Sequence, residues 1–236
     1  MKKILIIGFV WPEPNTTAAG TRMMQLITVF KNYGLEIHFV STAAKTTQSY
    51  NFDKDGIQTS NIELNNTSFN DFIIDFNPDI VLFDRYLTEE QFGWRVSENC
   101  PNAIKILDTE DLHFLRSARE KSFRKNIEVT DALLNNDITK REIASIYRCD
   151  LTLIISIYEL ELLKTKFKID SNLLCYTPFL LGKIPKDKFN KYPSFNERID
   201  FMTIGNFKHK PNLEAVKTLK KRIWPKIKSQ LPKSNI

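Results

Sequence analysis

Short apolar runs alternate along the chain with segments in which apolar residues stand three or four positions apart. The first apolar run is Ile4–Ile7, and a polar loop over residues 9–22 follows it. Apolar residues then recur at helical spacing: Met23, Leu26, Ile27, Phe30 and Tyr33. The run predicts a strand buried on both faces, and the spaced positions predict an amphipathic helix that ends at Gly34.

The same alternation continues as far as residue 176. Apolar runs predict strands at residues 36–41, 57–64, 80–83, 103–107, 151–155 and 173–176. Helical spacing predicts helices at residues 68–76, 88–99 and 158–167, and two more within 109–148 that are separated near Asn135. Strands and helices that alternate in this way are typical of a doubly wound sheet. We therefore expect an α/β fold, a Rossmann-like parallel sheet with helices on both faces.

The periodic pattern lapses over residues 183–199, where prolines and lysines interrupt it. A strand at residues 200–204 and a helix at residues 211–228 are then predicted. We expect a first domain over residues 1–182, a linker over 183–199, and the start of a second α/β domain over 200–236. Because one strand and one helix cannot bury their own apolar faces, we expect this second domain to be truncated.

Composition narrows the class of protein. Apolar residues make up 42% of the 236 positions, which is enough for a hydrophobic core. The three cysteines are odd in number and share no short spacing, which argues against a disulfide framework and favours a reducing compartment. No segment approaches the ~18 consecutive apolar residues that a membrane span needs. We therefore expect a cytoplasmic protein.

Residue spacing excludes several kinds of site. All seven glycines stand alone, so the sequence has neither the dinucleotide-binding fingerprint nor the phosphate-binding P-loop. The three histidines lie far apart, without an acidic or thiol partner at ligand spacing. We therefore expect no metal site, and no cofactor is implied.

The net charge of +6 is unevenly distributed. Residues 183–236 carry 14 Lys or Arg against 4 Asp or Glu, whereas residues 1–182 carry 20 against 24. A positive segment of this kind can contact the phosphates of a nucleotide, a nucleic acid or an anionic lipid surface. It can equally be a solvated, lysine-rich face, and composition alone leaves both interpretations open.

Ionisable residues follow one predicted strand at its carboxyl end, where open α/β sheets bind ligands. The stretch is Asp108-Thr-Glu-Asp-Leu-His113. Glu110, Asp111 and His113 could accept hydrogen bonds from sugar hydroxyls there, or take a proton. The alternative is structural: Asp108 caps the next helix, and Asp111 occupies the third position of that helix.

Two further segments are candidates for binding. Asp84-Arg85 follows another predicted strand in the same way, although an ion pair of this kind is often structural. Gly205-Asn-Phe-Lys-His209 precedes a helix that begins at Pro211. A glycine lets a ligand approach the backbone closely, a helix N-terminus directs N–H groups at it, and Lys208 adds positive charge. The second segment therefore has the pattern of an anion site.

A family resemblance rests on four stretches of the sequence. Phe201-Met-Thr-Ile-Gly-Asn-Phe-Lys-His-Lys-Pro-Asn-Leu-Glu-Ala-Val216, with Ile223-Trp-Pro225 downstream, resembles the opening of the donor domain in group 1 (family 4-like) glycosyltransferases. Leu107-Asp-Thr-Glu-Asp-Leu-His-Phe-Leu-Arg-Ser-Ala-Arg119 resembles a segment of the acceptor domain in the same enzymes. Two shorter stretches support the match, namely Cys149-Asp150 with Ser156 and Glu159, and the first loop with Pro12, Pro14, Gly20 and Arg22.

The resemblance implies the GT-B architecture, in which two Rossmann-like domains face each other across a cleft. A sugar passes from a nucleotide diphosphate sugar to an acceptor, usually without a metal. The implied partners are that donor and a glycan or lipid-linked acceptor, and no nucleic acid. The basic segment is also compatible with a peripheral contact to an anionic membrane surface.

The same resemblance assigns roles to individual residues. Those expected in the catalytic centre are Glu110, Asp111 and His113. Those expected to contact the acceptor are Gly20, Arg22, Asp84 and Arg85, with Gly20 and Arg22 in the first loop. Those expected to contact the donor are Gly205, Asn206 and His209.

Two features depart from the family pattern. The Pro-Asn-Gly turn that commonly closes the first domain is here Thr177-Pro178-Phe179. The donor-domain glutamate pair that holds the nucleotide sugar has no counterpart before Ile236. We therefore expect a glycosyltransferase whose chain is inactive by itself. The alternative, from a different class, is a non-catalytic sugar- or nucleotide-binding α/β module that persists as a truncated remnant.

Overall fold

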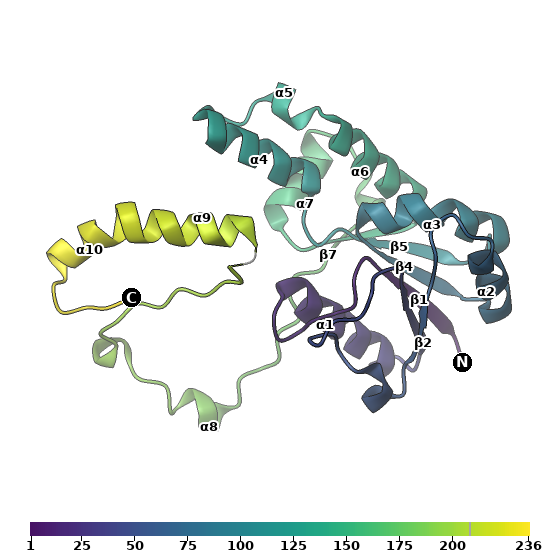
Figure 1. Ribbon diagram of the computed structural model, residues 1–236, viewed down its shortest axis with the longest axis horizontal. Helices are drawn as coiled ribbons and strands as arrows, with labels where there is room; N and C mark the ends of the chain where they lie inside the picture. Colours follow the sequence, from purple (N-terminus) through teal and green to yellow (C-terminus); the bar gives the residue numbers. More distant parts are fainter. Residues whose placement is uncertain (208) are drawn as a thin grey trace. The chain divides into compact units, whose positions relative to one another are not determined.

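The computed structural model describes residues 1–207 and 209–236 of the chain (Figure 1). The described residues divide into two compact units, Met1–Leu180 and Leu181–Ile236. The predicted division into residues 1–182, 183–199 and 200–236 stays a prediction.

The first unit is built on one seven-stranded parallel sheet with the strand order β3-β2-β1-β4-β5-β6-β7. The strands are β1 (Lys3–Gly8), β2 (Glu36–Ser41), β3 (Gln58–Asn61), β4 (Ile80–Asp84), β5 (Ile104–Asp108), β6 (Leu151–Ile154) and β7 (Leu174–Tyr176). The order runs outward in both directions from the β1–β4 pair, so the topological switch point lies between these two strands. The predicted Rossmann-like α/β fold is confirmed.

Helices connect the strands of this sheet. They are α1 (Ala18–Asn32), α2 (Ser68–Phe76), α3 (Arg85–Asn99), α4 (His113–Lys125), α5 (Asp131–Leu134), α6 (Asp137–Arg148) and α7 (Ile157–Thr165), with short 3₁₀ turns at Phe52–Asp55 and Ser171–Leu173. Every connection between neighbouring strands is a crossover, as parallel pairing requires.

Both faces of the sheet are buried, because successive side chains of a strand point to opposite faces. On one face Leu5 and Ile7 of β1 join a core with α2, α3, α4, α6 and α7. On the other face Ile4 and Ile6 pack with apolar residues of α1 and with Trp11. This alternation explains why β1 is a continuous apolar run.

Two predicted boundaries in the first unit are wrong. Helix α1 begins at Ala18 and not after residue 22, because the Thr17 side chain caps it by accepting the Gly20 N–H at 3.0 Å. Gly20 and Arg22 therefore lie in a helix and not in a loop. The 109–148 segment holds three helices, since α4 ends where Asn126 adopts a left-handed φ of 51°. The predicted break near Asn135 is confirmed.

The second unit is helical among its described residues. It contains α8 (Lys186–Phe189), a 3₁₀ turn at Phe195–Glu197, and α9 (Lys210–Thr218), which continues through a π-helical segment at Leu219–Ile223 into α10 (Trp224–Gln230). The predicted helix over residues 211–228 is thus confirmed. The predicted strand at 200–204 is wrong, because a strand needs a neighbouring strand for its backbone hydrogen bonds, and none is present among the described residues. Lys208 lies outside the described residues.

The helices of the described residues are too short or too polar to cross a membrane.

Candidate functional site

A cavity of about 280 Å³ opens beside the carboxyl ends of β1 and β4. Its walls come from the segment after β1, the start of α1, the segment after β2, and the residues that follow β4 and β5. The lining residues are Val10, Trp11, Pro12, Glu13, Thr17, Ala19, Gly20, Met23, Ala44, Thr46, Ser49, Asp84, Arg85 and Glu110. The cavity therefore lies at the topological switch point, where sheets of this class bind ligands.

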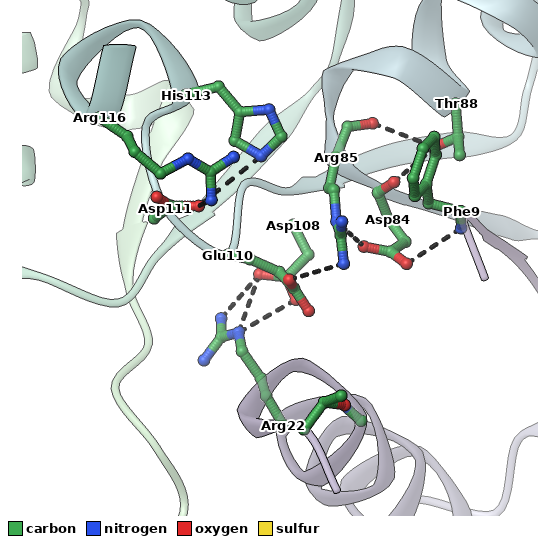
Figure 2. A network of polar contacts seen from close by, with 12 residues as sticks. Phe9, Arg22, Asp84, Arg85, Thr88, Asp108, Glu110, Asp111, His113 and Arg116 are labelled. Atoms are coloured by element: carbon green, nitrogen blue, oxygen red, sulfur yellow. Dashed lines mark hydrogen bonds and ion pairs between the residues drawn. The ribbon is translucent and has the colours of Figure 1, made fainter. Parts of the chain in front are cut away.

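Arg85 and Glu110 form an ion pair at the inner wall of this cavity, with 2.9 Å between Nη2 and Oε2 (Figure 2). Arg85 has a φ of 73° and Glu110 a φ of 58°, both in the left-handed region. A residue other than glycine costs ~1–3 kcal/mol in sparsely populated backbone regions, and such residues cluster at functional sites. Two strained residues in contact, each within two residues of the end of a parallel strand, are the strongest geometric signal of function in this unit.

Burial governs the protonation of Glu110. It raises the pKa of Glu110 to about 8, with the nearby Asp84 adding to the shift and Arg85 opposing it. The carboxyl group therefore exchanges its proton near physiological pH: the ionised form pairs with Arg85, and the protonated form can also donate a hydrogen bond. A carboxyl group with this pKa suits proton exchange near physiological pH.

Asp84 holds two segments of the inner wall together. Its carboxylate accepts the Phe9 N–H at 3.0 Å and the Arg85 Nε–H at 3.1 Å. The Arg85 guanidinium also lies over the ring of Phe9, 5.1 Å from the centroid. Asp84 and Arg85 thus form the ion pair that the sequence suggested, and both also line the cavity.

Arg22 and Asp108 form a second ion pair that is fully buried and does not line the cavity. Arg22 donates from Nη2 to Asp108 Oδ1 at 2.8 Å, and from Nε to both carboxylate oxygens at 3.0 Å. Burial raises the pKa of Asp108, whereas the hydrogen bonds from Arg22 lower it. The alternative role for Asp108 as a cap of the next helix is wrong, because this carboxylate binds Arg22 and α4 has no side-chain cap from its own N-cap residue.

Gly20 lines the cavity from the first turn of α1. A Cβ atom at this position would lie 2.5 Å from the backbone of Glu13, closer than real Cβ atoms approach other heavy atoms. The glycine therefore lets the start of α1 pack directly on the segment after β1, and a substitution would push these two walls apart.

Asp111 and His113 follow Glu110 closely in the chain, and neither lines the cavity. Figure 2 shows both of them beside Arg116. The His113 ring packs edge-on against Tyr86, and its Nε2 lies 3.6 Å from Asp111 Oδ1. Burial, with the positive charges of Arg116 and Arg85, lowers the pKa of His113 to about 3, so the ring is neutral at physiological pH. The suggested third position for Asp111 is also wrong, since α4 begins at His113. The predicted catalytic roles of both residues stay predictions.

The hydroxyl groups of the cavity are not among the residues predicted from the sequence. Thr17, Thr46 and Ser49 line it beside the predicted residues. Threonine is a common helix cap, but Thr17 lies six positions before Met23, the first residue of the apolar-periodic segment, so the pattern does not single it out. Thr46 and Ser49 lie in a polar stretch without periodicity, and only the folded chain brings them to α1.

The predicted donor-binding residues lie in the second unit. His209 is the residue before α9, and its N–H donates to the Asn206 carbonyl at 3.0 Å. The Asn212 side chain donates to the same carbonyl at 3.2 Å, and a Cβ atom at Gly205 would lie 3.2 Å from Asn212. His209 precedes a helix start, as the predicted anion site requires, and the donor-binding roles stay predictions.

No cluster of three or more His, Cys, Asp or Glu side chains able to hold a metal occurs in residues 1–207 and 209–236.

No protein-family model and no curated protein matches the sequence. Solved structures do match the fold. Sucrose-phosphate synthase from Thermosynechococcus elongatus aligns with a TM-score of 0.54 at 11% identity, over 75% of this chain and 48% of that one. The apo form of the lipopolysaccharide outer core galactosyltransferase WaaB aligns with a TM-score of 0.49 at 14% identity, over 75% and 46%. An alpha-glucosyltransferase in complex with UDP and a 13-mer DNA aligns with a TM-score of 0.39 at 13% identity, over 65% and 37%.

At 11% identity, the match to sucrose-phosphate synthase is a similarity of fold. The chain spans about half the length of the first two of these proteins. A similarity of this degree establishes the Rossmann-like architecture and leaves the reaction to the chemistry of the site.

Proposed function

We propose that the chain is the acceptor-binding part of a glycosyltransferase that moves a sugar from a nucleotide diphosphate sugar to a glycan or lipid-linked acceptor. One observation carries the proposal: the strained Arg85–Glu110 pair lines an open cavity at the switch point of a parallel sheet. The family resemblance of residues 107–119 and 201–216, and the fold similarity to sucrose-phosphate synthase, support the same conclusion.

In this proposal Glu110 is the group that exchanges a proton with a hydroxyl of the acceptor. Its pKa of about 8 keeps it close to half-protonated at slightly alkaline pH, where a carboxyl group can act in either direction. Arg85 holds the carboxyl group in place and supplies positive charge for an anionic group of the ligand. The hydroxyls of Thr17 and Ser49 in the wall provide hydrogen bonds of the kind that fix sugars.

Asp111 and His113 support the same centre in this proposal. A neutral His113 ring presents one acceptor nitrogen, and Asp111 next to it accepts a hydrogen bond from Arg116 at 3.1 Å. On the donor side, the turn of Gly205, Asn206 and His209 would offer the backbone N–H groups of the α9 start to the diphosphate.

Binding and turnover measured separately test this proposal. UDP, GDP and ADP and their glucose conjugates are titrated into the 236-residue chain by calorimetry, and release of the nucleoside diphosphate is followed with a library of oligosaccharide acceptors. The same assays are run on any longer product of the same gene. We expect binding of one nucleotide family, and turnover in the protein that holds both domains.

Two variants connect the activity to the cavity. Glu110→Gln should lower turnover by ~10²–10⁴, the usual contribution of a general acid or base, without changing nucleotide affinity. Glu90→Gln is the matched control, because Glu90 forms a partly exposed pair with Arg141 at 2.6 Å outside the cavity lining. Equal turnover in both variants would overturn the role of Glu110. Binding without turnover in every form would favour the non-catalytic module instead.

A further inference from the structure

Three consecutive backbone N–H groups at the start of α4 are held by carboxylates from two other helices. The Leu112 N–H donates to Glu159 Oε1 at 3.2 Å. The N–H groups of His113 and Phe114 donate to the two oxygens of Glu142 at 2.9 and 2.8 Å. Glu142 belongs to α6 and Glu159 to α7, so the cap of α4 comes from residues 28 to 47 positions along the chain.

A helix is normally capped from its own chain. The first N–H groups of a helix have no partner within it, and a Ser, Thr, Asp or Asn at the N-cap usually accepts one of them. The N-cap residue of α4 is Leu112, whose side chain has no acceptor. The two distant carboxylates take over this role, at the positive end of the helix dipole, where negative charge is favoured.

This arrangement is a costly way to cap a helix. Glu142 is 2% exposed and Glu159 7% exposed, and a buried carboxylate loses its hydration. Glu159 Oε2 has no hydrogen-bond partner among the described residues. A polar residue at position 112 would satisfy the helix more cheaply, so capping alone does not account for two buried acids.

The caps also fix one end of the segment that carries Glu110. At the other end, the Thr109 hydroxyl donates to the Leu153 carbonyl at 3.0 Å, and the Asp111 N–H donates to the Thr109 carbonyl at 2.7 Å. Glu110 thus lies between two anchored ends, in a left-handed conformation that an unrestrained glutamate would leave. Release of either end would let the Glu110 carboxyl group leave Arg85.

We propose that Glu142 and Glu159 are positioning residues that hold the residue 109–112 segment in the conformation that pairs Glu110 with Arg85. Neither lines the cavity, and both act through the start of α4. The proposal rests on the proposed function only where it concerns turnover, because the geometry of Glu110 can be measured without a ligand.

Hydrogen exchange and carboxyl titration by NMR test the proposal on the full chain. In Glu142→Gln the amide group of the new side chain faces two N–H donors with only one acceptor oxygen. We expect the His113 and Phe114 amides to exchange about tenfold faster or more, as the loss of a hydrogen bond to a charged group implies. We also expect the pKa of Glu110 to fall by about one unit or more towards its ordinary value, because the released carboxyl group reaches water.

Two further variants keep the test decisive. Glu159→Gln removes the charge from the carboxylate that accepts the Leu112 N–H, so it is the alternative test if Glu142→Gln does not fold. In Glu159→Gln the Leu112 amide should exchange faster, and the pKa of Glu110 should fall in the same way. Glu142→Asp keeps the charge on a side chain too short to reach both amides, and should behave like Glu142→Gln if geometry is what matters.

Glu89→Gln is the matched control. Glu89 is also a buried carboxylate, 1% exposed, but it pairs with Arg148 and contacts no amide of α4. Glu89→Gln should lower stability, while the exchange rates of the Leu112, His113 and Phe114 amides and the pKa of Glu110 stay unchanged.

Faster amide exchange in Glu142→Gln with an unchanged Glu110 pKa would mean that Glu142 and Glu159 are simple caps, and would overturn the proposal. The expected NMR changes without any turnover in the wild-type protein would support it and count against the proposed function alone.

Discussion

At the scale of the residue, the buried charged groups near the carboxyl edge of the sheet have specific polar partners. Arg22 shows this most clearly. Its guanidinium holds Asp108 with three hydrogen bonds and also donates to the Thr177 carbonyl at 2.7 Å. A buried charge whose partner is removed keeps its desolvation cost and loses its compensation. Arg22 therefore joins α1, β5 and the segment after β7.

Arg22→Met should accordingly lower the free energy of unfolding by ~3–5 kcal/mol, the usual cost of breaking a buried pair. Urea unfolding followed by circular dichroism measures it. The control is Arg141→Met, which breaks the partly exposed pair with Glu90 and should cost ~0–1 kcal/mol. The double variant Arg22→Met with Asp108→Leu should recover much of the loss, because no unpaired charge remains. A cost for Arg22→Met no larger than that of the control would show that the pair is solvated.

The raised pKa of Glu110 predicts how stability depends on pH. A carboxyl group whose pKa is about 8 when folded and 4.5 when unfolded stabilises the fold at low pH, and this contribution is lost as pH rises through 8. Glu142, with a pKa of about 7, acts in the same direction. His113, whose pKa falls from 6.5 to about 3, acts oppositely, but its contribution is complete above pH 6.5.

We therefore expect the free energy of unfolding to decrease between pH 6.5 and 8.5, by ~1 kcal/mol or more. Glu110→Gln should flatten this decrease, because its side chain does not titrate. Urea midpoints at several pH values measure the effect, and Glu63→Gln, at an exposed carboxylate, should keep the slope of the wild type. An identical slope in Glu110→Gln would mean that Glu110 is ionised throughout this range.

At the scale of the element, the sequence predicts what local chemistry determines. The apolar runs locate all seven strands of the sheet to within a few residues, since burial on both faces leaves a continuous apolar signal. The predicted helix at residues 68–76 coincides with α2. The start of α1 is missed by several residues because its cap, Thr17, lies inside a polar loop where many residues resemble caps.

The candidate site is predictable only in part, because the sequence pattern reports local chemistry and not which distant residues meet. Asp84, Arg85 and Glu110 can be selected because each stands at or directly after the end of a buried strand, and all three line the cavity. The Arg22–Asp108 pair joins residues 86 positions apart, and nothing local in the sequence indicates it. The caps from Glu142 and Glu159 are hidden likewise, because acids on amphipathic helices ordinarily face water.

A strand is predicted at residues 200–204 but does not form, which shows that an apolar pattern alone does not determine a strand. Its residues have the apolar character of a strand, but a strand exists only when neighbouring strands accept its hydrogen bonds. In this stretch the Phe201 N–H donates to the Asn235 carbonyl, and no strand pairs with it among the described residues. The helix over α9 and α10 forms because a helix satisfies its backbone internally.

At the scale of the whole molecule, the two units differ in what holds them together. Every member of the two hydrophobic cores lies between Ile4 and Cys175. The last segment of the first unit is held to α1, since Arg22 donates to the Thr177 carbonyl and the Leu180 N–H donates to Gln25 at 2.9 Å. The net positive charge of the chain lies beyond these contacts, in residues 183–236, so any contact with an anionic membrane surface stays a prediction about that part.

A chain shortened to residues 1–180 should therefore remain folded and become more soluble. It keeps both cores and the contacts of Arg22 with the segment after β7. It loses the partly exposed apolar residues of the second unit, among them Leu213 and Ile223, which promote association. We expect one cooperative urea transition with a midpoint close to that of the first unit in the full chain.

A chain shortened to residues 1–173 is the control, because it loses β7 and the Thr177 carbonyl, and should be less stable by ~2 kcal/mol or more. If the 1–180 chain unfolds as readily as the 1–173 chain, the second unit is part of the core and the first is not an independent domain.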